Sequence, residues 1–197
     1  MRARGKIFVI SGPSGSGKTT LAASLLKDPD LRLKLCRSIS VTTRLPRTGE
    51  HNKRDYFFIG EAEFKRRLKA KKILEWTTYL GYYYGTDRDF VEDRLLRYEG
   101  IVLCLDVVGA MRLKRMYQKR AVTIFVLPPS RKELYRRIRQ RSSSTPEHEI
   151  AGRLAVARDE IKAAKDYDYR LVNRDLTKAI ERLKRIVRLN LPDNYED

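Results

Sequence analysis

The feature of this sequence that most constrains its fold is a glycine-rich turn between an apolar run and a helical stretch. Residues 12–19 read GPSGSGKT and match the pattern G-x-x-x-x-G-K-[ST]. The apolar run KIFVI at residues 6–10 precedes the turn, and residues 18–26 follow it with leucines at helical spacing. A strand that enters a helix through such a turn is the phosphate-binding unit of many α/β proteins.

The chemistry of this turn is the binding of a nucleotide phosphate. Its glycines let successive backbone N–H groups point at a phosphate, and the N-terminus of the following helix adds partial positive charge. Lys18 is expected to reach the β- and γ-phosphates, and the Thr19 hydroxyl is expected to hold Mg²⁺. The turn alone does not separate a kinase from a GTPase or an ATP-driven motor. The residues expected to bind the nucleotide are Gly12, Pro13, Ser14, Gly15, Ser16, Gly17, Lys18, Thr19 and Thr20.

The rest of the chain alternates short apolar runs with helical stretches. Continuous apolar runs such as GIVLCLD at residues 100–106 are typical of strands buried on both faces. The alternation predicts an α/β fold in one domain, with a parallel sheet that has helices on both faces. Further strands are predicted at 37–43, 56–59, 74–84, 121–127 and 170–173, and further helices at 61–72, 87–98, 130–141, 147–165 and 176–189.

The charge of the chain predicts anionic partners. Lys and Arg number 43 against 25 Asp and Glu, a net charge of +18. Nucleotides, nucleic acid and membrane headgroups all fit such an excess. The basic residues are spread along the chain, which argues against a disordered nucleic-acid arm, and no apolar run approaches the roughly 20 residues that cross a bilayer. The short apolar run near the N-terminus does not suit a secretory signal, so cytoplasmic residence is expected.

Three uncommon residues receive structural interpretations. Cys36 and Cys104 lie in apolar stretches without metal-ligand spacing and are expected to be buried free thiols. Trp76 is expected to be a core anchor. The polar stretch SSSTP at residues 142–146 is typical of a mobile segment, either a hinge or a solvated loop.

A second anion-binding pattern follows the first strand and helix. Arg44 and Arg47 are three residues apart, and the hydroxyl side chains of Ser40 and Tyr56 flank them. Arginine gives planar, bidentate, charge-assisted hydrogen bonds to a phosphate dianion, and hydroxyls add neutral ones. This segment is therefore a candidate site for a second phosphate.

Several further motifs follow the phosphate loop in a fixed order. They are SVTTRLPRTGE (40–50), DYFF (55–58), ILEW (73–76), YYGT (83–86), LDVVG (105–109), LPPS (127–130) and LVN (171–173). This order of motifs resembles the guanylate kinase family, and the resemblance runs from about residue 7 to residue 189. It implies transfer of the γ-phosphoryl group of Mg·ATP to GMP, and also to dGMP, giving ADP and GDP in purine nucleotide metabolism.

The resemblance also implies an architecture of three parts. These parts are a P-loop core (about 1–39, 100–129 and 166–197), a small GMP-binding lobe (about 40–99) and a helical lid (about 130–165).

Roles for single residues follow from the same resemblance. Glu75 would accept hydrogen bonds from guanine N1–H and the exocyclic amine, while Ser40 and Thr86 would donate toward O6. Adenine has an acceptor at N1 and no amine at C2, so a buried carboxylate would reject it. The GMP phosphate would be held by Arg44, Arg47, Tyr56 and Tyr84.

The remaining implied roles concern the transferring phosphate. Asp106 would serve the Mg²⁺ site together with Thr19, or would order the acceptor-site arginines. Arg137, Arg141 and Arg153 would join Lys18 in neutralising the charge on the phosphoryl group. Asn173 would lie near the adenine of ATP.

Two departures from the family pattern bear on function. The family usually has an acidic residue at the position of Cys104, where it helps to recognise the guanine amine. A thiol is a weak hydrogen-bond partner, so we expect guanine selectivity to be weakened but retained. The stretch between Arg141 and Arg153 is one residue longer than usual, with the extra residue among 142–144.

Other functions fit part of the sequence. A kinase of the same fold could act on another phosphorylated acceptor, such as a ribose phosphate. A non-catalytic guanylate-kinase-like interaction module is disfavoured by the intact phosphate loop. A nucleic-acid-binding protein is suggested only by the charge and is not expected. The expected partners are ATP and GMP, with the chain as a monomer or homodimer.

Overall fold

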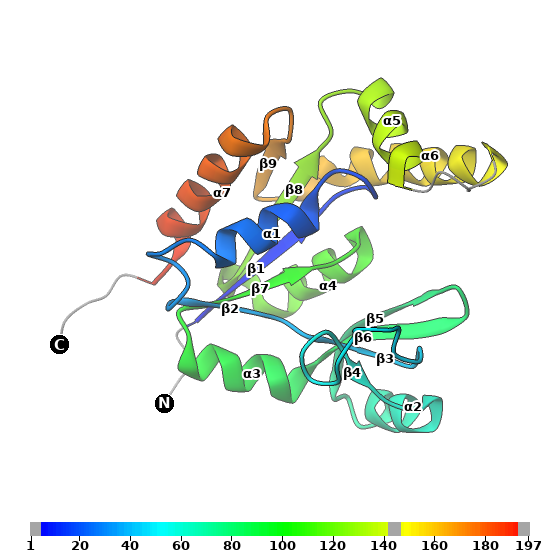
Figure 1. Cartoon of the computed structure of the whole chain (residues 1–197). Helices are drawn as coiled ribbons and strands as arrows, with labels where there is room; N and C mark the ends of the chain where they lie inside the picture. The colour runs from blue at the N-terminus through cyan, green and yellow to red at the C-terminus, as the bar shows by residue number, and fades with distance from the viewer. Residues whose placement is uncertain (1–4, 142–146, 193–197) are drawn as a thin grey trace.

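A sheet of five parallel strands forms the centre of the molecule (Figure 1). The computed structural model describes residues 5–141 and 147–192. The strand order is β2-β7-β1-β8-β9, so β1 lies in the middle and the turn that follows it lies at the centre of the sheet's carboxyl edge. The strands are β1 (Lys6–Ser11), β2 (Leu35–Arg37), β7 (Gly100–Cys104), β8 (Ala121–Leu127) and β9 (Tyr169–Val172).

Helices cover both faces of this sheet because its strands carry apolar side chains in both directions. Phe8 and Ile10 of β1 pack in a cluster with α1 and α7, whereas Ile7 and Val9 pack in another with α3 and α4. The covering helices are α1 (Lys18–Leu26), α3 (Arg88–Arg97), α4 (Val107–Tyr117) and α7 (Leu176–Asn190). Two short 3₁₀ helices, η1 (Gln118–Arg120) and η2 (Ala163–Asp166), lead into β8 and toward β9.

Residues 40–87 form a second, smaller unit that we call the small lobe. Its four-stranded sheet has the order β4-β3-β6-β5, and β6 pairs in antiparallel fashion with both of its neighbours. The fully buried apolar residues of its cluster are only Val41, Phe64 and Ile73. The elements are β3 (Ser40–Thr42), β4 (Phe57–Phe58), α2 (Glu61–Lys69), β5 (Ile73–Tyr79) and β6 (Tyr82–Asp87).

Two helices that we call the lid helices extend from the carboxyl edge of the central sheet (Figure 1). They are α5 (Arg131–Arg141) and α6 (Glu147–Lys162). Leu134 and Ile138 of α5 pack against Ile150 and Ala157 of α6. The predicted hinge at 142–146, including the extra residue expected there, lies outside the described residues.

The predicted α/β fold with a parallel sheet and helices on both faces is confirmed, and the helix at 18–26 and the strand at 121–127 have the predicted bounds. The single strand predicted at 37–43 is wrong. Two strands lie there, because the chain leaves the central sheet after Ser38, whose N–H donates to Val102 O (2.9 Å). The stretch 74–84 is a hairpin that turns at Leu80 and Gly81, both at positive φ. Helix α4 is absent from the sequence prediction.

The expectations for Trp76 and the cysteines also need correction. Trp76 is 41% exposed, because it begins the exposed outer half of β5, and its ring lies against that of Tyr83 at the edge of the lobe's apolar cluster, with ring centres 5.7 Å apart. Cys36 is half-buried and Cys104 is exposed, since it ends β7 at the open carboxyl edge of the sheet.

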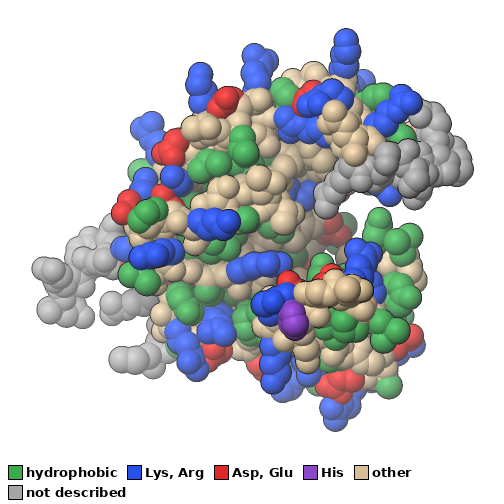
Figure 2. All heavy atoms as spheres, viewed as in Figure 1, with side chains coloured by type: hydrophobic (Ala, Val, Ile, Leu, Met, Phe, Trp, Pro, Cys, Tyr) green, Lys and Arg blue, Asp and Glu red, His purple; other side chains and the backbone are tan. Residues whose placement is uncertain are grey.

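The surface and helices bear on partners. Lys and Arg side chains are scattered over the visible face of the core, lid helices and small lobe rather than gathered in one patch (Figure 2). No helix in the described part of the chain is both long and apolar enough to cross a bilayer.

Candidate active site

The phosphate loop joins the end of β1 to the start of α1. Gly12, Gly15 and Gly17 have φ values of 136°, 85° and 95°, a region that side chains with a Cβ rarely adopt. A Cβ at Gly12 would lie 2.3 Å from Val126 O, so the loop also packs too closely on β8 for a larger residue. The loop therefore has its shape because of glycine at these positions, and it leads directly into the N-terminus of α1, whose partial positive charge favours an anion.

Lys18 extends back over this loop. Its amine donates to the carbonyl oxygens of Gly12 and of Pro13, the latter at 3.0 Å. The ammonium group is thus held at the loop's centre, where a bound phosphate would also be held. The reach of Lys18 to the β- and γ-phosphates stays a prediction.

A cavity of 680 Å³ opens at the mouth of the loop. Thr19 and Asp106 both line it, so a hydroxyl and a carboxylate face the same space. Asp106 Oδ1 accepts a hydrogen bond from Gly109 N at 2.7 Å, which caps α4 and holds this carboxylate at the carboxyl edge of the sheet. We call this space the donor cavity. Its other lining residues are Gly12, Ser14, Gly15, Gly17, Lys18, Thr20, Cys104, Leu105, Arg137 and Glu160.

Of the three predicted lid arginines, Arg137 is the one that the structure, within its described residues, places at the donor cavity. Arg137 lines the donor cavity, where Glu133 Oε1 accepts from its Nε at 2.8 Å and orients the guanidinium. Arg153 is half-buried on α6. Arg141 is the last residue of α5, and its side chain lies outside the described part of the chain.

Asn173 holds the phosphate loop through a side-chain hydrogen bond. Its side chain is buried, and Nδ2 donates to Ser16 O at 2.8 Å, so β9 is tied to the phosphate loop. Arg137 in turn donates to the carbonyl of Asn173 at 3.2 Å. The contact of Asn173 with adenine stays a prediction.

The second predicted phosphate site lies in the small lobe. Arg44 donates two hydrogen bonds to the Glu50 carboxylate, at 3.0 and 2.9 Å, and its guanidinium carbon lies 5.4 Å from the centre of the Tyr56 ring. Tyr56 and Tyr84 meet edge to face with ring centres 6.1 Å apart. Glu50 also accepts from the backbone N–H of Arg47 at 2.9 Å, while the Arg47 side chain is exposed. Glu50 therefore orders the segment that carries both arginines.

The predicted base-recognition residues come together where the small lobe meets the core. Ser40 and Thr86 are direct partners across β3 and β6, and the Thr86 hydroxyl donates to Glu75 Oε1. Glu75 is only 5% exposed, and burial raises the pKa of its carboxyl group to about 7, with nearby Asp106 adding to the rise. A Cβ at Gly109 would lie 2.8 Å from Glu75 Oε2, so glycine there leaves room for this carboxylate.

A second cavity of 310 Å³ lies between α1 and the small lobe. We call it the acceptor cavity, because Ser40, Tyr56 and Thr86 line it. It shares Lys18, Thr19, Cys104 and Leu105 with the donor cavity. Figure 2 shows the hollow between the small lobe and the rest of the molecule. The two cavities thus meet at the lysine of the phosphate loop.

Cys104 stands at this junction. It is exposed to the cleft, yet protein surrounds it on most sides, and that burial raises the pKa of the thiol. The thiol is therefore neutral at pH 7 and gives only weak hydrogen bonds to a polar ligand.

Three charged lining residues are absent from the predicted site residues, namely Glu160, Arg37 and Asp55. Glu160 lines the donor cavity, and it follows Arg153 by seven residues, which is two helical turns and the same face of α6. This spacing from a predicted site residue was the only sequence signal that could have indicated Glu160. Arg37 lines the acceptor cavity from the carboxyl end of β2, where the crevice of a parallel sheet is expected.

The oxygen atoms at the donor cavity fit a magnesium ion. Mg²⁺ prefers hard oxygen ligands and is held by one or two carboxylates together with substrate phosphates and water. Thr19 and Asp106 supply a hydroxyl and a carboxylate in one cavity. No group of three or more acidic, histidine or cysteine side chains with metal-binding geometry occurs in the described ranges.

The fold and the site define the class of P-loop kinases, in which a phosphate loop on a parallel sheet faces a separate acceptor cleft. A model of the guanylate kinase family matches residues 4–190. The chain belongs to the guanylate kinase family.

Relatives with known names are similar along nearly their whole length. The guanylate kinase of Wolbachia pipientis is 40% identical over 95% of this chain and 91% of its own length, and that of Synechocystis is 42% identical over 93% and 94%. The crystal structure of guanylate kinase from Anaplasma phagocytophilum has a TM-score of 0.75 and 31% identity, covering 98% of this chain and 90% of that one.

Proposed function

We propose that this enzyme transfers the γ-phosphoryl group of Mg·ATP to the phosphate of GMP, and also of dGMP, giving ADP and GDP. The observation that carries the proposal is the meeting of the donor and acceptor cavities at Lys18. Two phosphates bound on either side of one ammonium group have the relative position that in-line transfer needs. The family relationship names the acceptor.

The residues contribute position and charge rather than covalent chemistry. The acceptor is already an ionised phosphate, so no general base is required. Lys18, held on the loop, and Arg137, held by Glu133, would neutralise the charge that spreads over the transferring group. We propose the same role for Arg153 and Arg141. Bound Mg²⁺, held by Thr19 with help from Asp106, would supply further neutralisation of the phosphate oxygens.

One set of residues would recognise the base of the acceptor nucleotide, and another set would bind its phosphate. The carboxylate of Glu75 can accept from the two adjacent N–H groups of guanine, and Ser40 can donate to O6. Thr86 can donate to O6 only when it releases Glu75, because its hydroxyl has a single proton and donates that proton to Glu75 in the structure. Arg44, Arg47, Tyr56 and Tyr84 would bind the phosphate. The GMP-binding lobe of the predicted division (40–99), which contains the small lobe and α3, and the predicted helical lid (130–165) would close on the core and exclude water.

A coupled ADP-release assay with GMP, AMP, IMP, CMP and UMP tests the proposed function. We expect the highest kcat/KM with GMP and measurable but slower turnover of IMP and AMP, because the neutral Cys104 adds little to base recognition. Comparable rates with all three purines would show that Glu75 does not select guanine. No turnover with any monophosphate would contradict the proposal and favour the second candidate, a kinase of a sugar phosphate.

The activity should depend on the ionisation of Glu75. Because the pKa of this carboxyl is about 7, only its protonated form is abundant at pH 6, and that form cannot accept from both guanine N–H groups. We expect kcat/KM for GMP to fall about tenfold between pH 8 and pH 6 for this reason. The phosphate of GMP titrates near pH 6 as well. The Glu75→Gln variant separates the titration of Glu75 from that of GMP, because the GMP phosphate titrates equally in assays of both enzymes. The ratio of wild-type to variant kcat/KM should therefore rise with pH through about 7. A ratio that is constant with pH would contradict this assignment.

We further propose that the enzyme is cytoplasmic, that it acts as a monomer or homodimer, and that nucleic acid is not among its partners. The scattered distribution of Lys and Arg on the visible face supports the last point, since a nucleic-acid site needs a patch or stripe (Figure 2).

A further inference from the structure

Helix α2 packs on the back of strand β6, whose front carries two residues of the acceptor site. Successive residues of a strand point to opposite faces. Thr86 lines the acceptor cavity, and Tyr84 contacts an aromatic ring of the same site, so both lie on the front. Tyr83, Gly85 and Asp87 alternate with them and point to the back, where α2 lies.

Helix α2 contacts this back face at two places. Phe64 is fully buried and stacks on Tyr83, with ring centres 5.1 Å apart and planes inclined by 21°. A Cβ at Gly85 would lie 3.2 Å from the Phe64 ring, so strand and helix are in close contact. Three residues after Phe64, Arg67 donates from Nη1 to Asp87 Oδ2 at 2.8 Å. The spacing of three places both contacts on one face of the helix.

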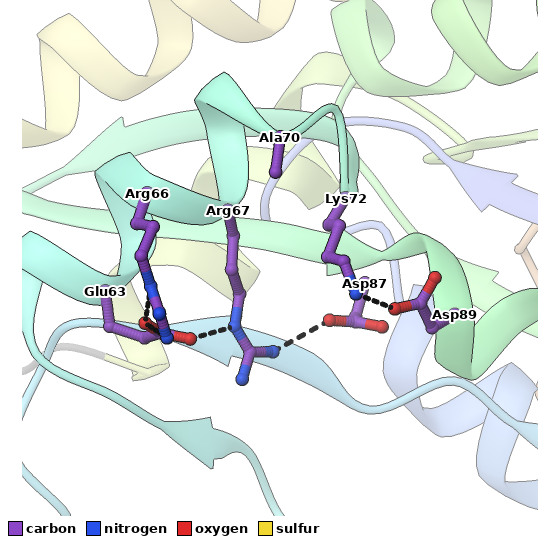
Figure 3. Close-up of a pocket in the computed structure, with 7 residues that line it drawn as sticks. All are labelled: Glu63, Arg66, Arg67, Ala70, Lys72, Asp87 and Asp89. Atoms are coloured by element: carbon purple, nitrogen blue, oxygen red, sulfur yellow. Dashed lines mark hydrogen bonds and ion pairs between the residues drawn. The ribbon is translucent and has the colours of Figure 1, made fainter.

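Arg67 and Asp87 are each held by a further bond. Figure 3 shows Arg67 between two carboxylates along the wall of a 470 Å³ cavity on this side of the lobe. Its Nε donates to Glu63 Oε1 at 2.7 Å, which orients the guanidinium along α2. Asp87 Oδ1 accepts from the N–H of Phe90 at 2.9 Å and so caps α3. The Asp87 side chain is 10% exposed and the Arg67 side chain 30%.

This ion pair adds to a small set of apolar contacts that hold α2 against β6, in which Leu68 of α2 and Tyr83 of β6 pack as partly buried residues on the cluster of the lobe. The buried residues of that cluster are Val41, Phe64 and Ile73, and Phe64 is the only buried residue of α2. A nearly buried carboxylate that loses its cation is costly, and the surrounding chain shifts to hydrate it. Asp87 is covalently joined to Thr86, so such a shift would move the hydroxyl that donates to Glu75.

We propose that Arg67 is a positioning residue for the acceptor nucleotide. By holding Asp87 from behind the strand, it keeps Thr86 and its hydrogen bond to Glu75 in the geometry that reads the guanine base. Arg67 itself lies on α2, behind the sheet, and is not among the residues that line either cavity of the active site. The inference rests on the proposed function, because it assigns a role in GMP binding.

Steady-state kinetics of Arg67→Ala test this role. We expect KM for GMP to rise about fivefold while KM for ATP stays within about twofold, because the donor cavity does not contact α2. Arg67→Lys should recover part of the loss, since it keeps a positive charge near Asp87. Arg66→Ala is the matched control. Arg66 is the preceding residue, pairs with the same Glu63 and is 79% exposed, and its loss should leave both KM values unchanged.

A double-mutant cycle tests whether Arg67 acts through Asp87. Asp87→Asn removes the charge but keeps an oxygen that can cap α3. In this background Arg67→Ala should change KM for GMP less than about twofold. An unchanged KM for GMP in Arg67→Ala, an equal rise of both KM values, or the same effect in both backgrounds would overturn the proposal. Failure of the wild-type enzyme to turn over GMP would instead overturn the proposed function. The two outcomes are distinguishable, because the first concerns the wild-type enzyme and the second concerns the Arg67 variants.

Discussion

Replacing Lys18 with alanine is expected to lower kcat at least about 10³-fold with GMP as acceptor. The ammonium group lies at the point shared by the donor and acceptor cavities, and the loop carbonyls of Gly12 and Pro13 hold it there. A positive charge fixed in a cleft stabilises charge that develops on the transferring group and needs no reorganisation during the reaction. Steady-state kinetics with purified wild-type and variant enzyme measure the loss.

The control for this variant is Lys27→Ala. Lys27 is an exposed lysine that follows α1, so its removal takes the same charge from the same region without touching either cavity. Circular dichroism and the melting temperature show whether both variants keep the fold. If Lys18→Ala retains kcat within tenfold of the wild type, then the phosphate loop does not carry the transfer and the proposed mechanism is wrong.

The sequence predicted β1, β7 and β8 of the central sheet well because these strands are continuous apolar runs, which are typical of strands covered by helices on both faces. Residues 121–127 are an example, since β8 occupies that whole run. The local hydrophobic pattern of the sequence did not show which neighbouring strands a given strand pairs with. Residues 37–43 look like one strand, yet Arg37 pairs with β7 of the core whereas Ser40 pairs with β6 of the small lobe.

Helix α4 was missed because tertiary packing overrides its local sequence. It begins with two β-branched valines and then Gly109, all poor helix formers. Gly109 is needed because any side chain there would meet the Glu75 carboxylate, and Asp106 compensates by capping the helix. A residue that weakens the helix thus makes room for the carboxylate that we propose reads the guanine base.

Much of the candidate site could be predicted because its residues belong to sequence motifs. Ser40, Glu75 and Thr86 lie on three different strands, and the pairing of β6 with β3 on one side and with β5 on the other brings them together. Supporting residues could not be found in this way. Glu50 and Arg67 belong to charged stretches in which many residues look alike, and only the fold shows that Glu50 bonds to Arg44 and that Arg67 bonds to Asp87, the neighbour of Thr86.

Glu75→Gln is expected to lower kcat/KM for GMP about 10³-fold at pH 8. The amide can still accept one hydrogen bond, but its NH₂ group faces the second N–H of guanine, so two donors are left against each other in a buried site. KM for ATP should change little, because Glu75 does not line the donor cavity. A loss smaller than tenfold would show that guanine is read elsewhere.

The same variant should be more stable than the wild type at pH 8, which separates loss of recognition from loss of structure. Burial raises the pKa of Glu75 from 4.5 to about 7, so the folded protein binds a proton more tightly than the unfolded chain. The stability of the wild type therefore falls as pH rises from about 4.5 to 7 and stays at the lower value above that range. Gln carries no charge at any pH and should gain on the order of 1–3 kcal/mol at pH 8, with the gain disappearing near pH 4.5. Thermal melts of both proteins across this range measure the difference. A variant that is less stable at pH 8 would mean that the ionised carboxylate is favourable in the fold, whereas higher stability with lost activity would show that the charge is kept for binding guanine.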